Sequence, residues 1–316
     1  MKLMDKLEEW VIKMKHELIQ DSNKIILKNV KDFEPKDIFE CGQCFRWKKE
    51  DDASYTGVAY NRLLNVKKVN NEIHFKNTNY QDFLNIWVNY FDLNTDYSLI
   101  KKRLSNEDKV MEKATSFGDG VRILRQEPWE TIISFIVSAN NNIPRIMKAI
   151  ELMCSRFGNE VGIYNGKKHY SFPEPKVLAN LKPEDLSACN MGYRGPYIIK
   201  TAKQILSNPN QIDLLQGINT DICREGLMEL SGVGPKVANC IAFFAFGKLD
   251  AFPVDVWVKR LMEFFYFNEE MKPKEIEAFA KKQYGQYAGY AQQYLFYYGR
   301  ELGIGKGGAK VVGYNS

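Results

Sequence analysis

The architecture of this chain can be inferred outward from one segment, Leu230-Ser-Gly-Val-Gly-Pro-Lys-Val-Ala-Asn-Cys240. It predicts a helix that ends before Gly232, a tight turn that includes Gly234, and a second helix opened by Pro235, because proline suits the first helical position. The turn of such a helix-hairpin-helix exposes backbone N–H groups that suit a DNA phosphate and read no sequence. A glycine pair between helices can also be only a compact turn.

Lys236 stands in the first turn of the second helix, where a cation is disfavoured. The helix dipole opposes a positive charge there by roughly 0.3 to 1 kcal/mol, so the dipole and partial burial together predict a lowered pKa for this amine. A neutral amine is the state that a nucleophile needs. Lys236 is therefore a candidate nucleophile, and the alternative is a solvated surface lysine.

A second candidate is Asp255, in the segment Phe252-Pro-Val-Asp-Val256. This segment predicts an extended entry to a helix with Asp255 at its N-cap, and capping alone would explain the aspartate. A carboxylate at a helix start can also face a substrate and stabilise positive charge that develops on a sugar. The two roles are compatible.

The rest of the chain divides into a sheet-forming part and a helical part. Runs of β-branched and aromatic residues between 23 and 75, with a tight turn at Asn70-Asn71, predict a small antiparallel sheet. Helical periodicity returns after residue 79, and Asn106 is a predicted N-cap. Before the sheet, an amphipathic helix is predicted by the stripe Leu3, Leu7, Trp10, Met14 and Leu18.

The predicted fold class is α+β, with two domains and a boundary at the glycine-containing segment 116–120. Residues 1–118 form the antiparallel sheet domain with flanking helices, residues 119–302 form an almost entirely helical domain, and residues 303–316 are a flexible tail. Helices of the second domain are expected at about 128–139, 144–158, 197–206, 221–230, 235–246, 256–265 and 288–299.

Composition narrows the possible functions. The 44 Lys and Arg against 39 Asp and Glu give a net charge of +5, which permits a nucleic-acid partner without demanding one. No apolar run reaches the roughly 18 to 20 residues of a membrane span, and the charged N-terminus is unlike a secretory signal, so we expect no membrane contact and a place in the cytoplasm or nucleoid. Six cysteines predict free thiols in a reducing compartment.

Metal and triad chemistry are disfavoured by the same inventory. The three histidines, His16, His74 and His169, are far apart in the sequence, which argues against a histidine-rich metal centre or a Ser-His-Asp triad. Cys41 and Cys44 have redox-motif spacing, but they lack a βαβ context and a second pair of zinc ligands.

The chain resembles the HhH-GPD superfamily of base-excision DNA glycosylases in two motifs, Gly232-Val-Gly-Pro-Lys236 and Pro253-Val-Asp255. It resembles the 8-oxoguanine DNA glycosylase branch in further segments that follow the family's order. These are Cys41-Gly-Gln-Cys-Phe-Arg-Trp47, Leu124-Arg-Gln-Glu-Pro128, Ser138-Ala-Asn-Asn-Asn-Ile-Pro-Arg145, Gly192-Tyr-Arg194, and Tyr287-Ala-Gly-Tyr-Ala-Gln292 continuing to Phe296. The resemblance extends from about Ile25 to Arg300.

The resemblance implies a bifunctional DNA glycosylase/AP lyase that excises 8-oxoguanine, preferably opposite cytosine, from duplex DNA as a monomer. Lys236 would attack C1′, expel the base and form a Schiff base whose β-elimination nicks the strand. Asp255 would stabilise the oxocarbenium-like sugar. Lyase activity follows from the lysine, because a water nucleophile leaves no imine to eliminate.

The resemblance also implies a pocket for the flipped lesion. Gly42 would place its carbonyl against N7–H of 8-oxoguanine, Gln292 would bind the Watson–Crick edge, and Phe296 would stack on the base. Cys240 would line this pocket, and Trp257 occupies a position near the lesion's phosphate where animal relatives carry histidine. Taken alone, the glycine could be a strand bulge, and the cysteine and the phenylalanine could be core residues.

On the DNA face, the resemblance implies that Asn140 fills the vacated stack and that Tyr193 wedges the opposite strand. Arg145 and Arg194 would read the orphaned cytosine, while Gly232 and Gly234 of the hairpin would contact phosphate. Asn140 could otherwise be a helix C-terminal cap. Pro144 departs from the family pattern and alters the loop that presents Arg145.

No organic cofactor is implied, and no iron–sulfur cluster is expected because no cysteine follows Cys240. By resemblance, backbone carbonyls of Met228, Leu230 and Val233 would hold a monovalent cation at the hairpin. Magnesium should be dispensable, because neither base loss nor β-elimination needs a Lewis acid.

Two alternatives stay open at this point. A monofunctional alkylbase glycosylase of the same superfamily would use the aspartate and a water molecule. A non-catalytic helix-hairpin-helix module would bind damaged and undamaged duplexes equally.

Overall fold

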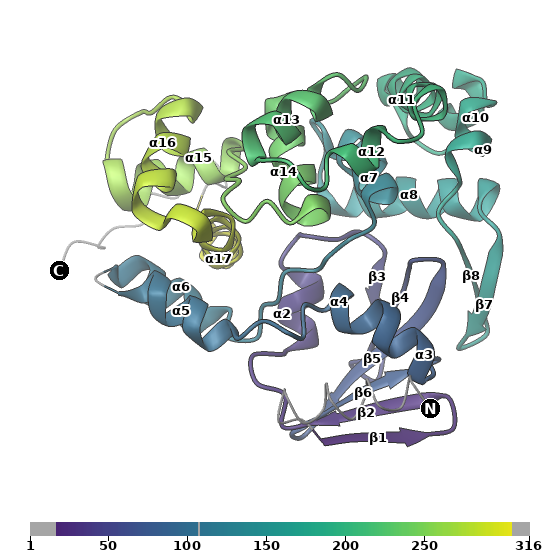
Figure 1. The fold of residues 1–316 in the computed structure, drawn as a ribbon, viewed down its shortest axis with the longest axis horizontal. Helices are drawn as coiled ribbons and strands as arrows, with labels where there is room; N and C mark the ends of the chain where they lie inside the picture. The colour runs from purple at the N-terminus through teal and green to yellow at the C-terminus, as the bar shows by residue number, and fades with distance from the viewer. Residues whose placement is uncertain (1–16, 107, 305–316) are drawn as a thin grey trace.

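In the computed structural model, which describes residues 17–106 and 108–304, the chain combines an antiparallel sheet with a helical region (Figure 1). The sheet has six strands in the order β1-β2-β6-β5-β4-β3. Their bounds are β1 (Glu17–Asp21), β2 (Lys24–Lys28), β3 (Trp47–Lys49), β4 (Tyr55–Ala59), β5 (Arg62–Val69) and β6 (Glu72–Lys76). The predicted α+β class and antiparallel sheet are confirmed.

Short turns join the strands at residues that tolerate positive φ. Asn70, with φ of 54°, joins β5 to β6, so the predicted turn at Asn70-Asn71 is confirmed. Ile25, Phe75 and Val66 are register partners across three strands and are fully buried. This row forms part of the first hydrophobic core.

The first helices lie between residues 35 and 117. They are α2 (Pro35–Glu40), α3 (Tyr80–Asp82), the π-helical η1 (Phe83–Trp87), α4 (Val88–Tyr90), α5 (Tyr97–Ser105) and α6 (Lys109–Phe117). Asp108 caps α6 by accepting from the N–H groups of Val110 and Met111 at 3.0 and 2.9 Å, whereas Asn106 is the C-cap of α5. The prediction of Asn106 as an N-cap is therefore wrong, because the nearby aspartate takes that role.

The helical region follows. Its helices are α7 (Pro128–Ser138), α8 (Ile143–Phe157), α9 (Pro175–Ala179), α10 (Pro183–Ser187), η2 (Gly192–Arg194), α11 (Gly195–Ser207), α12 (Gln211–Leu214), α13 (Thr220–Met228), α14 (Pro235–Phe246), α15 (Val256–Met262), η3 (Glu263–Phe267), α16 (Pro273–Tyr284), η4 (Gly285–Tyr287) and α17 (Ala288–Glu301). A two-stranded hairpin of β7 (Glu160–Tyr164) and β8 (Lys167–Tyr170) interrupts them. Its turn, Asn165-Gly166, has positive φ at both residues, as a two-residue hairpin requires.

The predicted N-terminal helix does not reach Leu18. Leu18 lies in β1 and pairs with Leu27 of β2, because the turn at Ser22, with φ of 54°, brings the two strands together. The other residues of that stripe, Leu3, Leu7, Trp10 and Met14, lie outside the described residues, as do residues 305–316 of the predicted tail.

The second hydrophobic core crosses the predicted domain boundary at residue 118. It contains Tyr97, Ile100 and Leu104 of α5 together with residues of α7, α14 and α17. Helices α5 and α6 therefore pack with the helical region rather than on the sheet, as Figure 1 shows beside α17.

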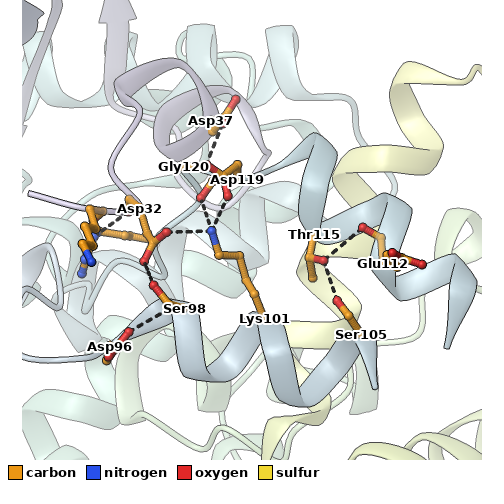
Figure 2. A network of polar contacts seen from close by, with 12 residues as sticks. Asp32, Asp37, Asp96, Ser98, Lys101, Ser105, Glu112, Thr115, Asp119 and Gly120 are labelled. Atoms are coloured by element: carbon orange, nitrogen blue, oxygen red, sulfur yellow. Dashed lines mark hydrogen bonds and ion pairs between the residues drawn. The ribbon is translucent and has the colours of Figure 1, made fainter. Parts of the chain in front are cut away.

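A polar network around Lys101 fastens the segment that enters the helical region (Figure 2). Lys101 Nζ donates to Asp32 at 2.7 Å, and the N–H of Gly120 donates to Asp37 at 3.1 Å. The carbonyl of Gly120 accepts from the N–H of Glu34 at 3.0 Å, and a Cβ at residue 120 would lie only 2.1 Å from the Glu34 Cβ. We call this set of hydrogen bonds, which joins residues 32–37 to Lys101 and Gly120, the seam. It fixes the start of α2, the helix that leads to Gly42.

All six cysteines are free thiols in the structure, as predicted. Among the described helices, none combines the length and the hydropathy that a membrane crossing demands.

Candidate active site

Lys236 lies in the first turn of α14, directly after the hairpin. Pro235 opens this helix, as predicted, and Gly234 is its N-cap residue. The Lys236 Nζ lies 5.8 Å from the ring centroid of Phe135, a residue of α7. Phe135 in turn stacks on Phe244 of α14 with ring centroids 5.5 Å apart. The amine therefore lies beside an aromatic ring, and the helix that carries it is mostly buried.

Two ionisable neighbours act on Lys236. The pKa of Lys236 is raised, first by its electrostatic interaction with Cys240 and also by the Asp255 carboxylate, while burial acts in the opposite direction. Burial raises the pKa of the Cys240 thiol, and the lysine charge lowers it. The lowered pKa predicted for Lys236 is wrong, because these two groups outweigh burial and the helix dipole.

Asp255 is held at the start of α15. Its carboxylate accepts from the N–H of Val258 at 2.8 Å, so the predicted N-cap is confirmed. Asp255 is half-buried, and its carboxylate is close enough to act electrostatically on Lys236. Trp257, in the first turn of the same helix, is also half-buried. The structure thus groups Lys236, Cys240 and Asp255, which come from two helices.

Gly42 and Phe296 meet although they are far apart in the sequence. Gly42 has φ of +88°, and a Cβ at this position would lie 2.9 Å from Phe296 Cε1 and 3.5 Å from Ile143 Cδ1. Both the backbone conformation and the space therefore require glycine. One turn before Phe296 on α17, Gln292 is 6% exposed, and its Oε1 has no hydrogen-bond partner within the described residues. A buried acceptor without a donor is what a bound base could satisfy.

Two glutamines that the sequence did not single out hold the Gly42 loop. The Nε2 of buried Gln43 donates to the carbonyls of Ile38 and Arg122 at 2.8 and 2.7 Å. The Nε2 of Gln293 donates to the carbonyl of Cys41 at 2.8 Å. Both glutamines flank residues predicted for the pocket, so their position in the sequence was the available signal. They fix the backbone on the N-terminal and C-terminal sides of Gly42.

The residues predicted for the DNA face gather at the end of α7. Asn140 has φ of 50°, and the preceding carbonyl of Ala139 accepts from Tyr193 Oη at 3.1 Å and Arg194 Nε at 2.9 Å. Arg194 also donates to the Asn140 carbonyl at 2.9 Å and lies over the Tyr193 ring. Arg145 is exposed in the first turn of α8. Arg194 is hydrogen-bonded to this loop, while Tyr193 is 56% exposed.

The helix-hairpin-helix predicted from the sequence is confirmed between α13 and α14. Gly232 has φ of +84° and packs so tightly that a Cβ there would lie 2.9 Å from the Tyr197 Cβ. Gly234, in contrast, has no heavy atom within 4 Å of such a Cβ, so this side of the turn is open. The N–H of Val233 donates to the Leu230 carbonyl at 3.1 Å, which closes the turn.

Comparisons with known proteins cover most of the chain. Residues 25–132 match the family model of the 8-oxoguanine DNA glycosylase N-terminal domain, and residues 133–286 match that of HhH-GPD superfamily base excision DNA repair proteins. The N-glycosylase/DNA lyase OGG1 of Arabidopsis thaliana is 32% identical over 282 residues, which is 82% of this chain and 75% of the relative.

Two solved structures agree with this chain over nearly their whole length. MBOgg1 in complex with a low affinity DNA ligand has 46% identity and a TM-score of 0.88, covering 91% of this chain and 99% of that one. The Clostridium acetobutylicum 8-oxoguanine glycosylase/lyase, in complex with double-stranded DNA containing cytosine opposite 8-oxoG, has 40% identity, the same TM-score of 0.88 and the same coverage.

Proposed function

This chain belongs to the 8-oxoguanine DNA glycosylase family of the HhH-GPD superfamily, and from that premise we propose that it excises 8-oxoguanine opposite cytosine through an imine on Lys236. The enzyme is an N-glycosylase with DNA lyase activity that acts on double-stranded DNA. Its proposed place of work is the cytoplasm or nucleoid, where the DNA is.

One observation carries the proposal: the amine of Lys236, beside the aromatic ring of Phe135, is subject to the charge of a capping carboxylate, Asp255. A lysine in solvent would have neither neighbour. The carboxylate is fixed by its own hydrogen bond to the α15 backbone, so it costs little reorganisation to stabilise a cationic sugar beside the amine.

The reaction needs a neutral amine at the start. Nζ of Lys236 forms a bond to C1′ as the bond from C1′ to the base nitrogen breaks, and the base leaves with the electron pair and takes up a proton. After the attacking amine loses a proton, its lone pair forms a double bond to C1′ as the C1′–O4′ bond breaks and O4′ takes up a proton, which gives the protonated imine. Loss of a proton from C2′ then forms the C2′–C3′ double bond as the C3′–O bond breaks, and the phosphate leaves with that electron pair, which nicks the strand.

The pocket proposed for the flipped base joins the two domains. The Gly42 carbonyl would accept from N7–H, a donor that 8-oxoguanine has and guanine lacks. The unpartnered Oε1 of Gln292 would accept from the Watson–Crick edge, and the ring of Phe296, which contacts Gly42, would stack on the base. Cys240 would line this pocket, with Trp257 near the phosphate.

On the DNA face, Asn140 would fill the vacated stack, with Tyr193 as the wedge and Arg145 and Arg194 reading the estranged cytosine. The open side of the hairpin at Gly234 would receive a phosphate on its backbone N–H groups. Since Arg194 donates to the Asn140 loop in the free chain, DNA binding would exchange some of these hydrogen bonds for hydrogen bonds to cytosine.

The backbone carbonyls at the hairpin are suitable ligands for a monovalent cation. The carbonyls of Met228, Leu230 and Val233 lie at and after the C-terminal end of α13, where the helix dipole favours positive charge. The Leu230 carbonyl accepts one hydrogen bond and keeps a second lone pair. Such an ion would be coordinated by these carbonyls, would attract a DNA phosphate by its charge, and would take no part in bond breaking.

Borohydride trapping tests the proposal. The protein is incubated with a duplex that carries one 8-oxoguanine opposite cytosine, and reduction should give a covalent protein–DNA adduct that Lys236→Gln abolishes. A duplex with guanine in place of the lesion is the control for damage specificity. Base release without an adduct would favour a water nucleophile, and the absence of both would favour a binding module; either result overturns the proposal.

Excess chelator provides a second check. Trapping and strand nicking should persist in millimolar EDTA, because no step needs a Lewis acid. Loss of both, with recovery when magnesium is restored, would contradict the imine mechanism as drawn.

A further inference from the structure

One face of α11 is bonded to the hairpin. The Nε2 of Gln204 donates to the Glu229 carbonyl at 3.0 Å, and its Oε1 accepts from the N–H of Ser231 at 2.9 Å. The hydroxyl of Thr201 donates to the Ser231 carbonyl at 2.7 Å. Tyr197 packs on Gly232, as the close approach to that glycine shows. Residues 197, 201 and 204 follow helical spacing, so they share one face.

The start of the same helix is bonded to the loop that carries Asn140. Tyr193 and Arg194 immediately precede α11, and both donate to the Ala139 carbonyl. The rings of Tyr193 and Tyr197 lie edge to face, with centroids 6.4 Å apart. One helix therefore connects the two regions that would contact DNA, the hairpin and the loop with Asn140 and Tyr193.

We propose that α11 acts as a strut that sets the position of the phosphate-binding hairpin relative to the wedge at Tyr193 and Asn140. Tyr197, Thr201 and Gln204 are the positioning residues. This inference rests on the proposed function, because it assumes that the hairpin and the wedge engage DNA at the same time.

The physical argument is one of pre-organisation. Gln204 satisfies a backbone acceptor and a backbone donor of the turn through one side chain, and because the hydrogen bond from the Ser231 N–H is partly buried, water replaces that bond poorly. Without it the turn samples more conformations, and DNA must order the turn on binding. Lys236 is held by the packing of α14 instead, so the bond-breaking step at saturating DNA should not depend on Gln204.

The first test measures binding apart from chemistry. Gln204→Met keeps the side-chain length but removes both hydrogen bonds, and Thr201→Val is a second, nearly isosteric variant. Each should weaken the Kd for a duplex with a tetrahydrofuran abasic analogue opposite cytosine by roughly 10-fold. The single-turnover excision rate at saturating DNA should stay within about twofold. Ser207→Ala, which removes an exposed hydroxyl that bonds only within α11, is the matched control.

A structural role without positioning would give a different pattern. It would lower the melting temperature and the fraction of active enzyme, titrated by borohydride trapping, while the Kd of the active fraction stayed at the wild-type value. That pattern for both variants would overturn the proposal.

A double-mutant cycle tests the coupling itself. Tyr193→Leu weakens the wedge, and its effect on Kd should be less than additive with Gln204→Met. When the hairpin is not held in position, the wedge and the hairpin no longer bind DNA cooperatively, so loss of the wedge weakens binding less. Strict additivity would overturn the strut. Failure of the proposed function is distinguishable, because wild-type protein would then form no adduct, whereas failure of the strut alone leaves wild-type trapping intact.

Discussion

At the scale of single residues, the protonation state of Lys236 limits the chemistry, because only the neutral amine attacks C1′. The pKa of Lys236 is raised, first by its interaction with Cys240, so the neutral fraction grows only as the pH rises toward that pKa. Cys240→Ala removes this first cause and should lower the pKa of Lys236. The alkaline rise of the single-turnover trapping rate should therefore move to lower pH, measured from neutral pH to beyond the ordinary lysine pKa of 10.5.

The control for this variant is Cys223→Ala, a buried thiol of α13 that is not among the groups acting on Lys236. Its pH profile should coincide with that of the wild type. A rise that stays in place, or moves to higher pH in Cys240→Ala, would show that the thiol does not control the amine.

Gly42 offers a prediction about recognition rather than chemistry. Gly42→Ala would place a Cβ 2.9 Å from Phe296 at a φ of +88°, a conformation that costs an alanine about 1 to 3 kcal/mol. Excision of 8-oxoguanine should fall by about 10-fold or more, because both the carbonyl and the stacking ring shift. Nicking of a preformed abasic site, which needs no base recognition, should fall much less.

Gly217→Ala is the matched control, because a Cβ at Gly217 meets nothing within 4 Å. Equal losses in excision and abasic-site nicking for Gly42→Ala would mean that Gly42 supports the fold of the site and does not recognise the base.

At the scale of helices and strands, Asp255 has two roles that substitutions can separate: it caps α15, and its charge stabilises the cationic sugar. Asn caps a helix as well as Asp does, so Asp255→Asn should keep the free energy of unfolding within about 0.5 kcal/mol of the wild type. Excision should nevertheless fall by roughly 100-fold or more, through loss of the charge that stabilises the sugar. Asp255→Ala should in addition lose about 1 kcal/mol of stability with the cap.

Urea unfolding and single-turnover excision at alkaline pH measure both effects. Since Asp255 raises the pKa of Lys236, its replacement supplies more neutral amine, and a slower reaction cannot then be attributed to a charged lysine. If Asp255→Asn excised 8-oxoguanine at the wild-type rate, Asp255 would act only as a helix cap.

The sequence predicted those elements whose ends carry their own chemistry. The bounds of α14 follow from Pro235 and Gly247, which has φ of 63°, and the hairpin follows from its two glycines. The β7–β8 hairpin was missed although Asn165-Gly166 is a turn signal, because the strands beside it are short and neither of them contains a buried residue. Strand β1 was missed because its residues also fit a helical stripe, and only pairing with β2 decides between them.

At the scale of the whole molecule, the candidate pocket is assembled from both ends of the chain. Gly42 lies after α2 and Phe296 lies in α17, yet they touch. Periodicity and spacing describe neighbours along the chain, so these residues were predicted only through the family resemblance, as was the group of Asn140, Tyr193 and Arg194. The pKa of Lys236 was mispredicted for a different reason: the sequence argument weighed only burial and the helix dipole, whereas Cys240 of the same helix and Asp255 at the start of α15 both raise it.

Arg122 extends the seam described above, because it joins residues 31 and 32 to the segment that enters the helical region, and it allows a test of how far the pocket depends on this seam. Its buried guanidinium donates to the carbonyls of Asp32 and Asp92 at 2.8 Å each, and to that of Lys31 at 3.1 Å. Its own carbonyl accepts from Gln43, which holds the Gly42 loop. Arg122→Met removes three hydrogen bonds, of which the one to the Asp92 carbonyl is buried and the other two are partly buried, and should lower the free energy of unfolding by about 3 kcal/mol.

Gln43, which holds the Gly42 loop, is bonded to the backbone of Arg122. The same variant should therefore lose hydrogen-exchange protection in the Gly42 loop before it unfolds globally. Arg103→Met, at an exposed position of α5, is the control and should change stability by no more than about 0.5 kcal/mol. Excision of 8-oxoguanine by Arg122→Met should therefore decline at temperatures where its helical region is still folded and abasic-site nicking persists. If excision and nicking were lost together, in one transition with global unfolding, the pocket would be no weaker than the rest of the fold, and the seam would contribute stability alone.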